Sequence, residues 1–190
     1  MKADMKVFFT ASYSGKKDYQ GMYDVVVKVL KDAGCDVVSL EVQNYANLLG
    51  AAAIKDLPEN EKHYLYIRKG IGIANAVIIE SSVDNFRLGF ESALSLVYNK
   101  PVLCLSMNKD YSNYIKNRDF HAYKYSDAKD LEQKVHDFIL EVKKKHFSVR
   151  FNGYLTPSQM NYLKGKSKKT GKTVSELIRE MVQSELDMSL

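Results

Sequence analysis

The first 145 residues alternate between short apolar runs and longer segments in which apolar residues recur every three or four positions. Short apolar runs are typical of buried strands, and the longer spacing is typical of helices with one buried face. Strands that alternate with helices form a parallel sheet with helices on both faces. The sequence therefore predicts an α/β fold with a flavodoxin-like, doubly wound sheet of five parallel strands.

The boundaries of the predicted elements follow from these patterns and from glycine and proline positions. Gly34 stands where a helix C-cap glycine belongs. Residues 41–57 have no clear pattern. The predicted strands are 6–10, 36–40, 76–80, 101–105 and 120–125, and the predicted helices are 19–33, 58–70, 86–98 and 131–145, with a short helix at 111–116.

In doubly wound sheets the ligand crevice lies beyond the carboxyl ends of the strands, where the strand order reverses. This rule places a ligand site at loops 11–15 and 81–90. Glu80 ends a predicted strand at the same edge, so we expect it to line the crevice. The cysteines, Cys35 and Cys104, lie in apolar contexts and are expected to be buried structural thiols.

Positive charge is concentrated in the last part of the chain. From Lys143 onward there are ten basic and four acidic residues, a net charge of +6, whereas the first 142 residues carry 18 basic and 19 acidic residues. Such asymmetry indicates a polyanion partner for the tail. A solvated lysine-rich face is the alternative.

The tail has the order strand, helix, turn, helix. Residues 148–155 alternate apolar and polar side chains, as a strand with one buried face does. Thr156–Gln159 supplies an N-cap, a first-turn proline and a capping-box glutamine, and Thr173–Glu176 forms a second capping box after Gly171. About forty residues bury little apolar surface alone, so we expect a homodimer or a higher homo-oligomer.

Residues 146–190 resemble the ribbon-helix-helix DNA-binding family in Leu155–Pro157, Lys169–Gly171 and Ser175–Arg179. The resemblance implies that strands of two chains pair into a ribbon that enters the major groove of DNA. Gly153 in mid-strand departs from this pattern, and a dimerisation element without DNA contacts is the alternative. The implied DNA-binding residues are Arg150, Asn152 and Tyr154 on the ribbon, with Lys172 and Thr173 at backbone phosphates.

Residues 5–142, within a domain at 1–145, resemble the nucleoside 2-deoxyribosyltransferase family, particularly its deoxynucleoside 5'-monophosphate N-glycosidase branch. The resemblance lies in residues 7–15, 74–80, 85–91 and 100–105. It implies a nucleoside or nucleotide ligand and an activity that needs neither a metal nor a cofactor. The substrate-binding residues that it implies are Ser12, Tyr13, Ser14, Gly15, Asn85, Arg87 and Gly89.

Glu91 stands where this family has its catalytic nucleophile, which attacks the anomeric carbon of the sugar. A carboxylate suits this role because it forms and releases a glycosyl ester while stabilising positive charge on the sugar. An acidic residue favoured by the dipole of a helix N-terminus is the alternative for Glu91.

The chain departs from the family pattern at several positions. Ile67, 24 residues before Glu91, stands where the family commonly has an aspartate that assists with the base. Asn85 and Arg87 replace a Ser-x-Gly, and Ser14 replaces an arginine. Arg87 can itself bind phosphate.

These features leave three functions open. We favour a DNA-binding regulator whose α/β domain senses a nucleoside or nucleotide; the alternative is an active N-glycosidase or deoxyribosyltransferase with Glu91 as nucleophile. An NAD glycohydrolase of the TIR-like kind ranks third. The sequence has no run of about 20 apolar residues and no signal-peptide pattern, so we expect a cytoplasmic protein without a membrane partner. The histidines 63, 121, 136 and 146 are scattered and receive no chemical role.

Overall fold

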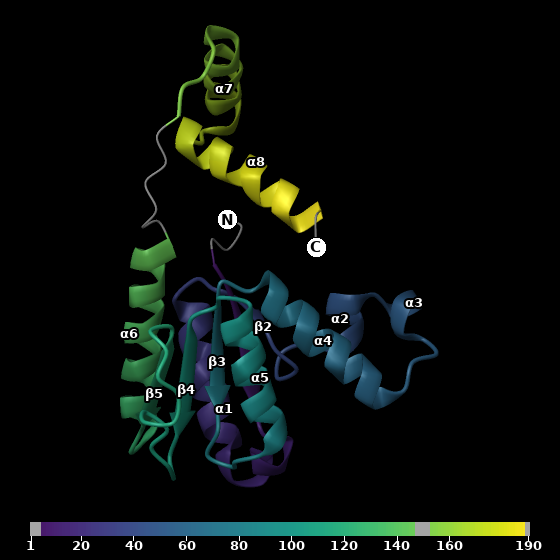
Figure 1. Cartoon of the computed structure of the whole chain (residues 1–190), viewed down its shortest axis with the longest axis vertical. Coiled ribbons are helices and arrows are strands. Elements are labelled where there is room, and N and C mark those ends of the chain that lie inside the picture. The colour runs from purple at the N-terminus through teal and green to yellow at the C-terminus, as the bar shows by residue number, and fades with distance from the viewer. Residues whose placement is uncertain (1–4, 147–152, 189–190) are drawn as a thin grey trace. The chain divides into compact units, whose positions relative to one another are not determined.

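Figure 1 shows the computed structural model of the chain, which describes residues 5–146 and 153–188. The chain divides into two compact units, Met1–Ser148 and Val149–Leu190. The first unit contains a sheet with its helices, and the described part of the second, residues 153–188, contains two helices.

The first unit is built on a five-stranded sheet in the order β2-β1-β3-β4-β5, and every neighbouring pair of strands is parallel. β3 and β4 are buried along their whole length, as the central strands of a parallel sheet are. This order is the flavodoxin-like one, so the predicted sheet of five parallel strands is confirmed. The strands are β1 (Lys6–Ala11), β2 (Asp36–Val38), β3 (Ala76–Glu80), β4 (Val102–Ser106) and β5 (Phe120–Lys124).

Helices cover both faces of this sheet (Figure 1). α1 (Lys16–Asp32) and α6 (Ala128–His146) pack side by side on one face, where their buried residues and those of the strands form one apolar core. α4 (Glu59–Ile73) and α5 (Phe86–Val97) cover the opposite face and form a second core. Each fully buried large apolar side chain stabilises such a core by about 1.5–3 kcal/mol.

Helix α1 ends as the sequence predicted. Gly34 has a φ of 74°, in the left-handed region that glycine adopts without strain. The Gly34 amide donates to the Lys31 carbonyl and the Cys35 amide donates to the Leu30 carbonyl, both at 2.9 Å. This pair of bonds is a Schellman motif, which turns the chain into β2.

Residues 41–57, which had no clear sequence pattern, form the short helices α2 (Tyr45–Leu49) and α3 (Ala51–Ile54). The Asn44 side chain accepts a hydrogen bond from the Asn47 amide at 3.2 Å, and the Asn47 side chain accepts one from the Asn44 amide at 2.9 Å. This capping box uses asparagine at both positions instead of the usual Ser or Thr with Glu or Gln. The Asn-x-x-Asn spacing was therefore a helix signal that the sequence analysis missed.

The predicted short helix at 111–116 is wrong, because residues 112–114 form a turn. The Asp110 carboxylate accepts a hydrogen bond from the Ser112 amide at 2.8 Å. Side-chain bonds of this kind compete with helical backbone bonds and favour turns.

The second unit contains α7 (Pro157–Thr170) and α8 (Val174–Met188), close to the predicted bounds. Thr156 and Gln159 form the expected capping box, and Gly171 ends α7 with a φ of 72°. The Glu176 carboxylate accepts from the Thr173 amide at 2.6 Å, and the Thr173 hydroxyl accepts from the Glu176 amide at 3.2 Å. Both predicted helix starts are confirmed.

The predicted strand at 148–155 lies mostly in residues 147–152, outside the described residues. The adjoining residues 153–155 are described and are not in a strand. Leu163 and Leu177 are buried, whereas Tyr162 and Val182 remain exposed along an apolar groove of about 500 Å³. The described part of the tail therefore shows two helices with uncovered apolar surface and does not show a ribbon-helix-helix module.

Glu80 does not line the crevice as expected. It lies on the face of the sheet covered by α1 and α6, and it is completely buried. Its Oε1 accepts hydrogen bonds from the Ser82 amide at 3.2 Å, from the Ser82 hydroxyl, and from the Tyr125 hydroxyl at 2.9 Å. Oε2 has no hydrogen-bond partner among the described residues. Burial raises the pKa of this carboxyl, although the bonds from Ser82 and Tyr125 act in the opposite direction.

The raised pKa of Glu80 predicts a pH-dependent stability. Because the folded-state pKa lies above the unfolded value of about 4.3, the contribution of Glu80 is fully present below that value and is lost as the pH rises through the folded-state pKa. Glu80→Gln keeps an acceptor for Ser82 and Tyr125 but does not ionise. We expect the melting temperature of Glu80→Gln minus that of wild type to increase as the pH rises above about 4.

Thermal unfolding followed by circular dichroism across that pH range measures this difference. Glu61→Gln, which changes an exposed carboxylate of α4, is the control. The difference between its melting temperature and that of wild type should not depend on pH. If the melting temperature of Glu80→Gln minus that of wild type stays constant or falls as the pH rises, the raised pKa of Glu80 is contradicted.

Candidate active site

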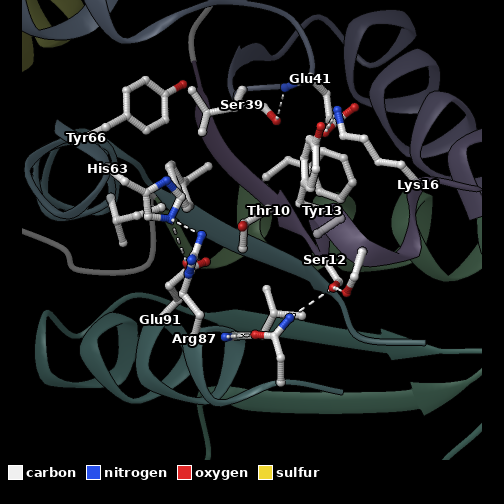
Figure 2. Close-up of a pocket in the computed structure, with 18 of the residues that line it drawn as sticks. Thr10, Ser12, Tyr13, Lys16, Ser39, Glu41, His63, Tyr66, Arg87 and Glu91 are labelled. Carbon is white, nitrogen blue, oxygen red and sulfur yellow. Dashed lines mark hydrogen bonds and ion pairs between the residues drawn. The ribbon is translucent and has the colours of Figure 1, made fainter. Parts of the chain in front are cut away.

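A cavity of about 620 Å³ opens at the carboxyl ends of β1 and β3 in the first unit. These neighbouring strands lie where the strand order reverses, which is the place that the sequence analysis predicted for a ligand. Residues of the loops after β1 and β2 line one side, and residues of α4 and α5 line the other (Figure 2).

Glu91 of α5 lines this cavity and is the most unusual of its polar groups. Its side chain is 1% exposed, and neither carboxylate oxygen has a hydrogen-bond partner among the described residues. It is the sixth residue of α5, beyond the first turn, where the helix dipole favours acidic residues. The dipole alternative for Glu91 is therefore not supported. A buried carboxylate without a partner is costly, so its position calls for a functional explanation.

His63 of α4 is a basic neighbour of Glu91. Its Nε2 lies 3.8 Å from Glu91 Oε1, a distance that suits an ion pair but exceeds a hydrogen bond. The same Nε2 lies 3.3 Å from Nη1 of Arg87, and Nδ1 lies 3.1 Å from the Tyr45 hydroxyl. Figure 2 shows His63, Arg87 and Glu91 gathered on one side of the cavity. The sequence analysis gave His63 no role, since no spacing in the chain links α2, α4 and α5.

The loop after β1 is tied directly to the start of α5. The Asn85 amide group donates to the Ser12 hydroxyl at 3.0 Å, and Ser12 and Ser14 share a hydrogen bond of 2.8 Å. Asn85 also caps α5, because its Oδ1 accepts from the Leu88 amide at 3.0 Å. Hydroxyl groups and the amide-rich start of α5 therefore come together in a form that suits an anion.

The remaining part of the cavity carries an ion pair and an exposed ring. Lys16 Nζ lies 2.9 Å from Glu41 Oε1 and 5.6 Å from the centre of the Tyr13 ring. Tyr13 is 81% exposed and Phe86, which also lines the cavity, is 92% exposed. Two aromatic rings are thus available at the cavity for stacking with a flat ligand.

The structure separates the predicted substrate-binding residues into two groups. Ser12, Tyr13, Ser14, Asn85 and Arg87 line the cavity together with Glu91. The two glycines do not line it.

The two glycines differ in the space around them. A Cβ on Gly15 would lie 2.4 Å from the Tyr23 hydroxyl, so glycine is needed there for packing. Gly89 is exposed and a Cβ on it would meet no atom within 4 Å. The geometry therefore does not support the substrate-binding role that the resemblance implied for Gly89.

Several lining residues were missed from the sequence. Tyr45 and Tyr66 come from α2 and α4, and their rings pack edge to face at 5.6 Å. Burial raises the pKa of Tyr66 to about 12, while a hydrogen bond from Gln43 acts in the opposite direction. Both tyrosines therefore remain protonated near neutral pH. Tyr45 lies in the segment without a sequence pattern, so nothing pointed to it.

The implied DNA-binding residues belong to the second unit. Arg150 and Asn152 lie outside the described residues. Tyr154 is fully exposed, the Lys172 amine pairs with Glu180, and Thr173 takes part in the capping box of α8. None of these observations tests DNA binding. In the described ranges, 5–146 and 153–188, no helix has the length and apolar content to cross a membrane, and no cluster of three metal-ligating side chains occurs.

No family model matches the chain. The chain is 28% identical over 153 residues to a candidate 2'-deoxynucleoside 5'-phosphate N-hydrolase 1 of Methanosarcina barkeri (strain Fusaro / DSM 804), which covers 73% of this chain and 87% of the relative. The chain is thus similar to the nucleoside 2-deoxyribosyltransferase-like family, near its deoxynucleoside 5'-phosphate N-hydrolases. The comparisons give no support to the ribbon-helix-helix resemblance of the tail.

Two solved structures are also similar to this chain. A CMP N-glycosidase of Clostridium botulinum has a TM-score of 0.49 and 13% identity, over 68% of this chain and 97% of that one. A 2-deoxyribosyltransferase of Bacillus psychrosaccharolyticus has a TM-score of 0.48 and 20% identity, over 67% of this chain and 90% of that one.

The double role of Asn85 predicts a measurable loss of stability. Asn85→Ala removes both the helix cap and the bond to Ser12, and we expect it to lower the free energy of unfolding by about 1–2 kcal/mol. Asn85→Ser keeps a capping oxygen but is too short to reach Ser12. It should therefore lower the free energy of unfolding by less than Asn85→Ala does. Urea unfolding measures the free energy of unfolding of both variants and of wild type. A decrease of less than about 0.5 kcal/mol for Asn85→Ala would contradict the double role of Asn85.

Proposed function

We propose that the α/β unit hydrolyses the N-glycosidic bond of 2'-deoxynucleoside 5'-phosphates, releasing the free base and 2-deoxyribose 5-phosphate. The observation that carries this proposal is the buried Glu91 carboxylate, which lines a cavity and has no hydrogen-bond partner within residues 5–146 and 153–188. The similarity to the Methanosarcina relative supports the substrate class. This ranking reverses the one drawn from the sequence, in which a nucleotide-sensing regulator came first.

A carboxylate that accepts no hydrogen bonds is well suited to nucleophilic catalysis. Hydrogen bonds to Glu91 would stabilise its negative charge and lower its nucleophilicity, and the described residues provide none. A Glu91 oxygen attacks C1' of the sugar, the bond from C1' to the base breaks, and a glycosyl ester forms. Water then attacks C1' and releases the carboxylate, as in retaining glycosidases.

The loop after β1 and the start of α5 suit the 5'-phosphate. Arg87 supplies a guanidinium group that pairs with phosphate oxygens in a fork. Ser12 and Ser14 supply hydroxyl donors, and the first amides of α5 add their partial positive charge. A phosphate held there would place the sugar beside Glu91, since Arg87 and Glu91 are one turn apart on α5.

The first test is release of free base from 2'-deoxynucleoside 5'-monophosphates, ribonucleoside 5'-monophosphates, nucleosides and NAD, followed by chromatography. We expect release from the deoxynucleotides, and release from the deoxynucleosides slower by about tenfold or more because the phosphate bonds are lost. Glu91→Gln should lower the rate by about 10³-fold or more. It should melt no lower than wild type, because it replaces a buried carboxylate that has no hydrogen-bond partner among the described residues.

Glu61→Gln, an exposed change on α4, is the matched control and should keep full activity. Equal rates for wild type and Glu91→Gln would refute a nucleophilic role. Release from NAD alone would instead support the NAD glycohydrolase alternative.

A second proposed function concerns the tail, which we propose binds DNA as a dimer. The observation that favours it is the apolar surface left open on α7 and α8 within a segment of net charge +6. A second copy can cover that surface, and the lysines suit a phosphate backbone. In this arrangement the α/β unit would make the DNA-bound protein responsive to nucleotides.

Selection from a pool of random DNA duplexes tests this second function with the full chain. We expect enrichment of a shared sequence, with affinity that falls steeply as salt increases. Arg150→Ala with Asn152→Ala should lower the affinity for the enriched duplex by about tenfold or more, because both side chains are expected at base edges. Unchanged affinity in that double variant would overturn the proposed ribbon.

A further inference from the structure

Cleavage of a glycosidic bond leaves an electron pair on the departing base. A base that accepts a proton as the bond breaks leaves as a neutral molecule, and such assistance contributes about 10²–10⁴-fold to rates. The proposed hydrolysis therefore needs a proton donor beside Glu91, and the nucleophile cannot fill that role itself.

The other titratable groups of the cavity are poorly suited to donate this proton. Glu41 and Lys16 are paired with each other at 2.9 Å, and Gln20 also donates to Glu41 at 3.1 Å. Arg87 does not release a proton in proteins. Burial raises the pKa values of Tyr45 and Tyr66, so their hydroxyls hold their protons firmly.

We infer that His63 is the acid and base that serves Glu91, delivering a proton from Nε2 to the departing base and then removing one from the attacking water. This inference rests on the proposed hydrolysis. Histidine exchanges protons near neutral pH more readily than any other ordinary side chain. Nε2 lies 3.8 Å from Glu91 Oε1 and therefore close to the sugar carbon that Glu91 would attack.

Tyr45 holds the imidazole in this orientation. Its hydroxyl lies 3.1 Å from Nδ1, and its ring packs edge to face against the imidazole at 6.1 Å. With Nδ1 engaged, Nε2 is the nitrogen that faces the cavity. Tyr45 is thus a positioning residue, which acts through His63.

Arg87 and Glu91 make opposite demands on Nε2. Arg87 donates a hydrogen bond to Nε2 only when that nitrogen carries no proton, whereas Glu91 pairs with it only when it is protonated. A phosphate that binds Arg87 removes the Arg87 hydrogen bond from Nε2. Nε2 can then carry a proton and pair with Glu91. Binding of the 5'-phosphate would therefore prepare the acid, which links substrate recognition to the chemistry.

The two half-reactions balance. In the first, a Glu91 oxygen bonds to C1', the electron pair of the C1'–N bond goes to the base, and the Nε2 proton neutralises it. In the second, Nε2 takes a proton from water while the water oxygen bonds to C1', and the electron pair of the ester bond returns to Glu91. His63 ends the cycle protonated, as it began.

A leaving group that needs no proton separates this role from a structural one. The experiment compares release of base from 2'-deoxynucleoside 5'-monophosphates with release of nitrophenolate from 4-nitrophenyl 2-deoxyribose 5-phosphate. His63→Asn should lower base release by about 10²–10⁴-fold and change the initial release of nitrophenolate little. Tyr45→Phe should show the same pattern to a smaller extent, and His136→Asn, an exposed change on α6, should leave both rates unchanged.

The outcomes distinguish this inference from the function on which it rests. Suppose that Glu91→Gln abolishes both reactions, and that His63→Asn and Tyr45→Phe either lower both rates equally or lower neither rate. The role of His63 is then overturned and the proposed hydrolase remains. If wild type releases neither product, or Glu91→Gln does not matter, the proposed function fails and the inference fails with it. Melting temperatures of the variants identify losses that are due to unfolding.

Discussion

The parallel pairing of β1 with β3 is the constraint on which the cavity depends. Their register sets Ala11 opposite Glu80, so both strands end at the same level and their following loops start side by side. The chain then leaves β1 towards α1 on one face and leaves β3 towards α5 on the other, which opens a space between them. The bond from Asn85 to Ser12 holds the two loops together across that space. The polar groups of the cavity are placed by this scaffold.

Two buried glutamates show how differently the fold treats the same side chain. Glu80 lies on the α1 and α6 face, and three hydrogen bonds converge on one of its oxygens. Glu91 lies on the α4 and α5 face, and its oxygens have no hydrogen-bond partner in the described part of the chain. The first arrangement fixes the carboxyl as part of the structure. The second would leave it free to act as the proposed nucleophile, at a cost in stability that is common at catalytic sites.

The inferred pairing of Glu91 with His63 links three elements that the sheet alone does not connect. α5 supplies the carboxylate and Arg87, α4 supplies the imidazole, and α2 supplies the tyrosine that orients it. The 5'-phosphate and the glycosidic bond would thus be recognised by groups one helical turn apart. A substrate that lacks the phosphate would leave Arg87 on Nε2, which gives a physical reason for selecting nucleotides over nucleosides.

The sequence by itself determined most of the periodic elements, the five-stranded parallel sheet and the switch-point loops, because each follows from local spacing. Its resemblance to the nucleoside 2-deoxyribosyltransferase family made Glu91 the candidate nucleophile. The sequence also determined both capping boxes of the tail, whose bonds join residues three apart. Tertiary structure alone decided that His63 and Tyr45 meet Glu91, that Glu80 turns away from the cavity, and that Gly15 serves packing. These contacts join residues between 8 and 45 positions apart, and the face of a strand or helix that a side chain occupies is settled only when the layers pack.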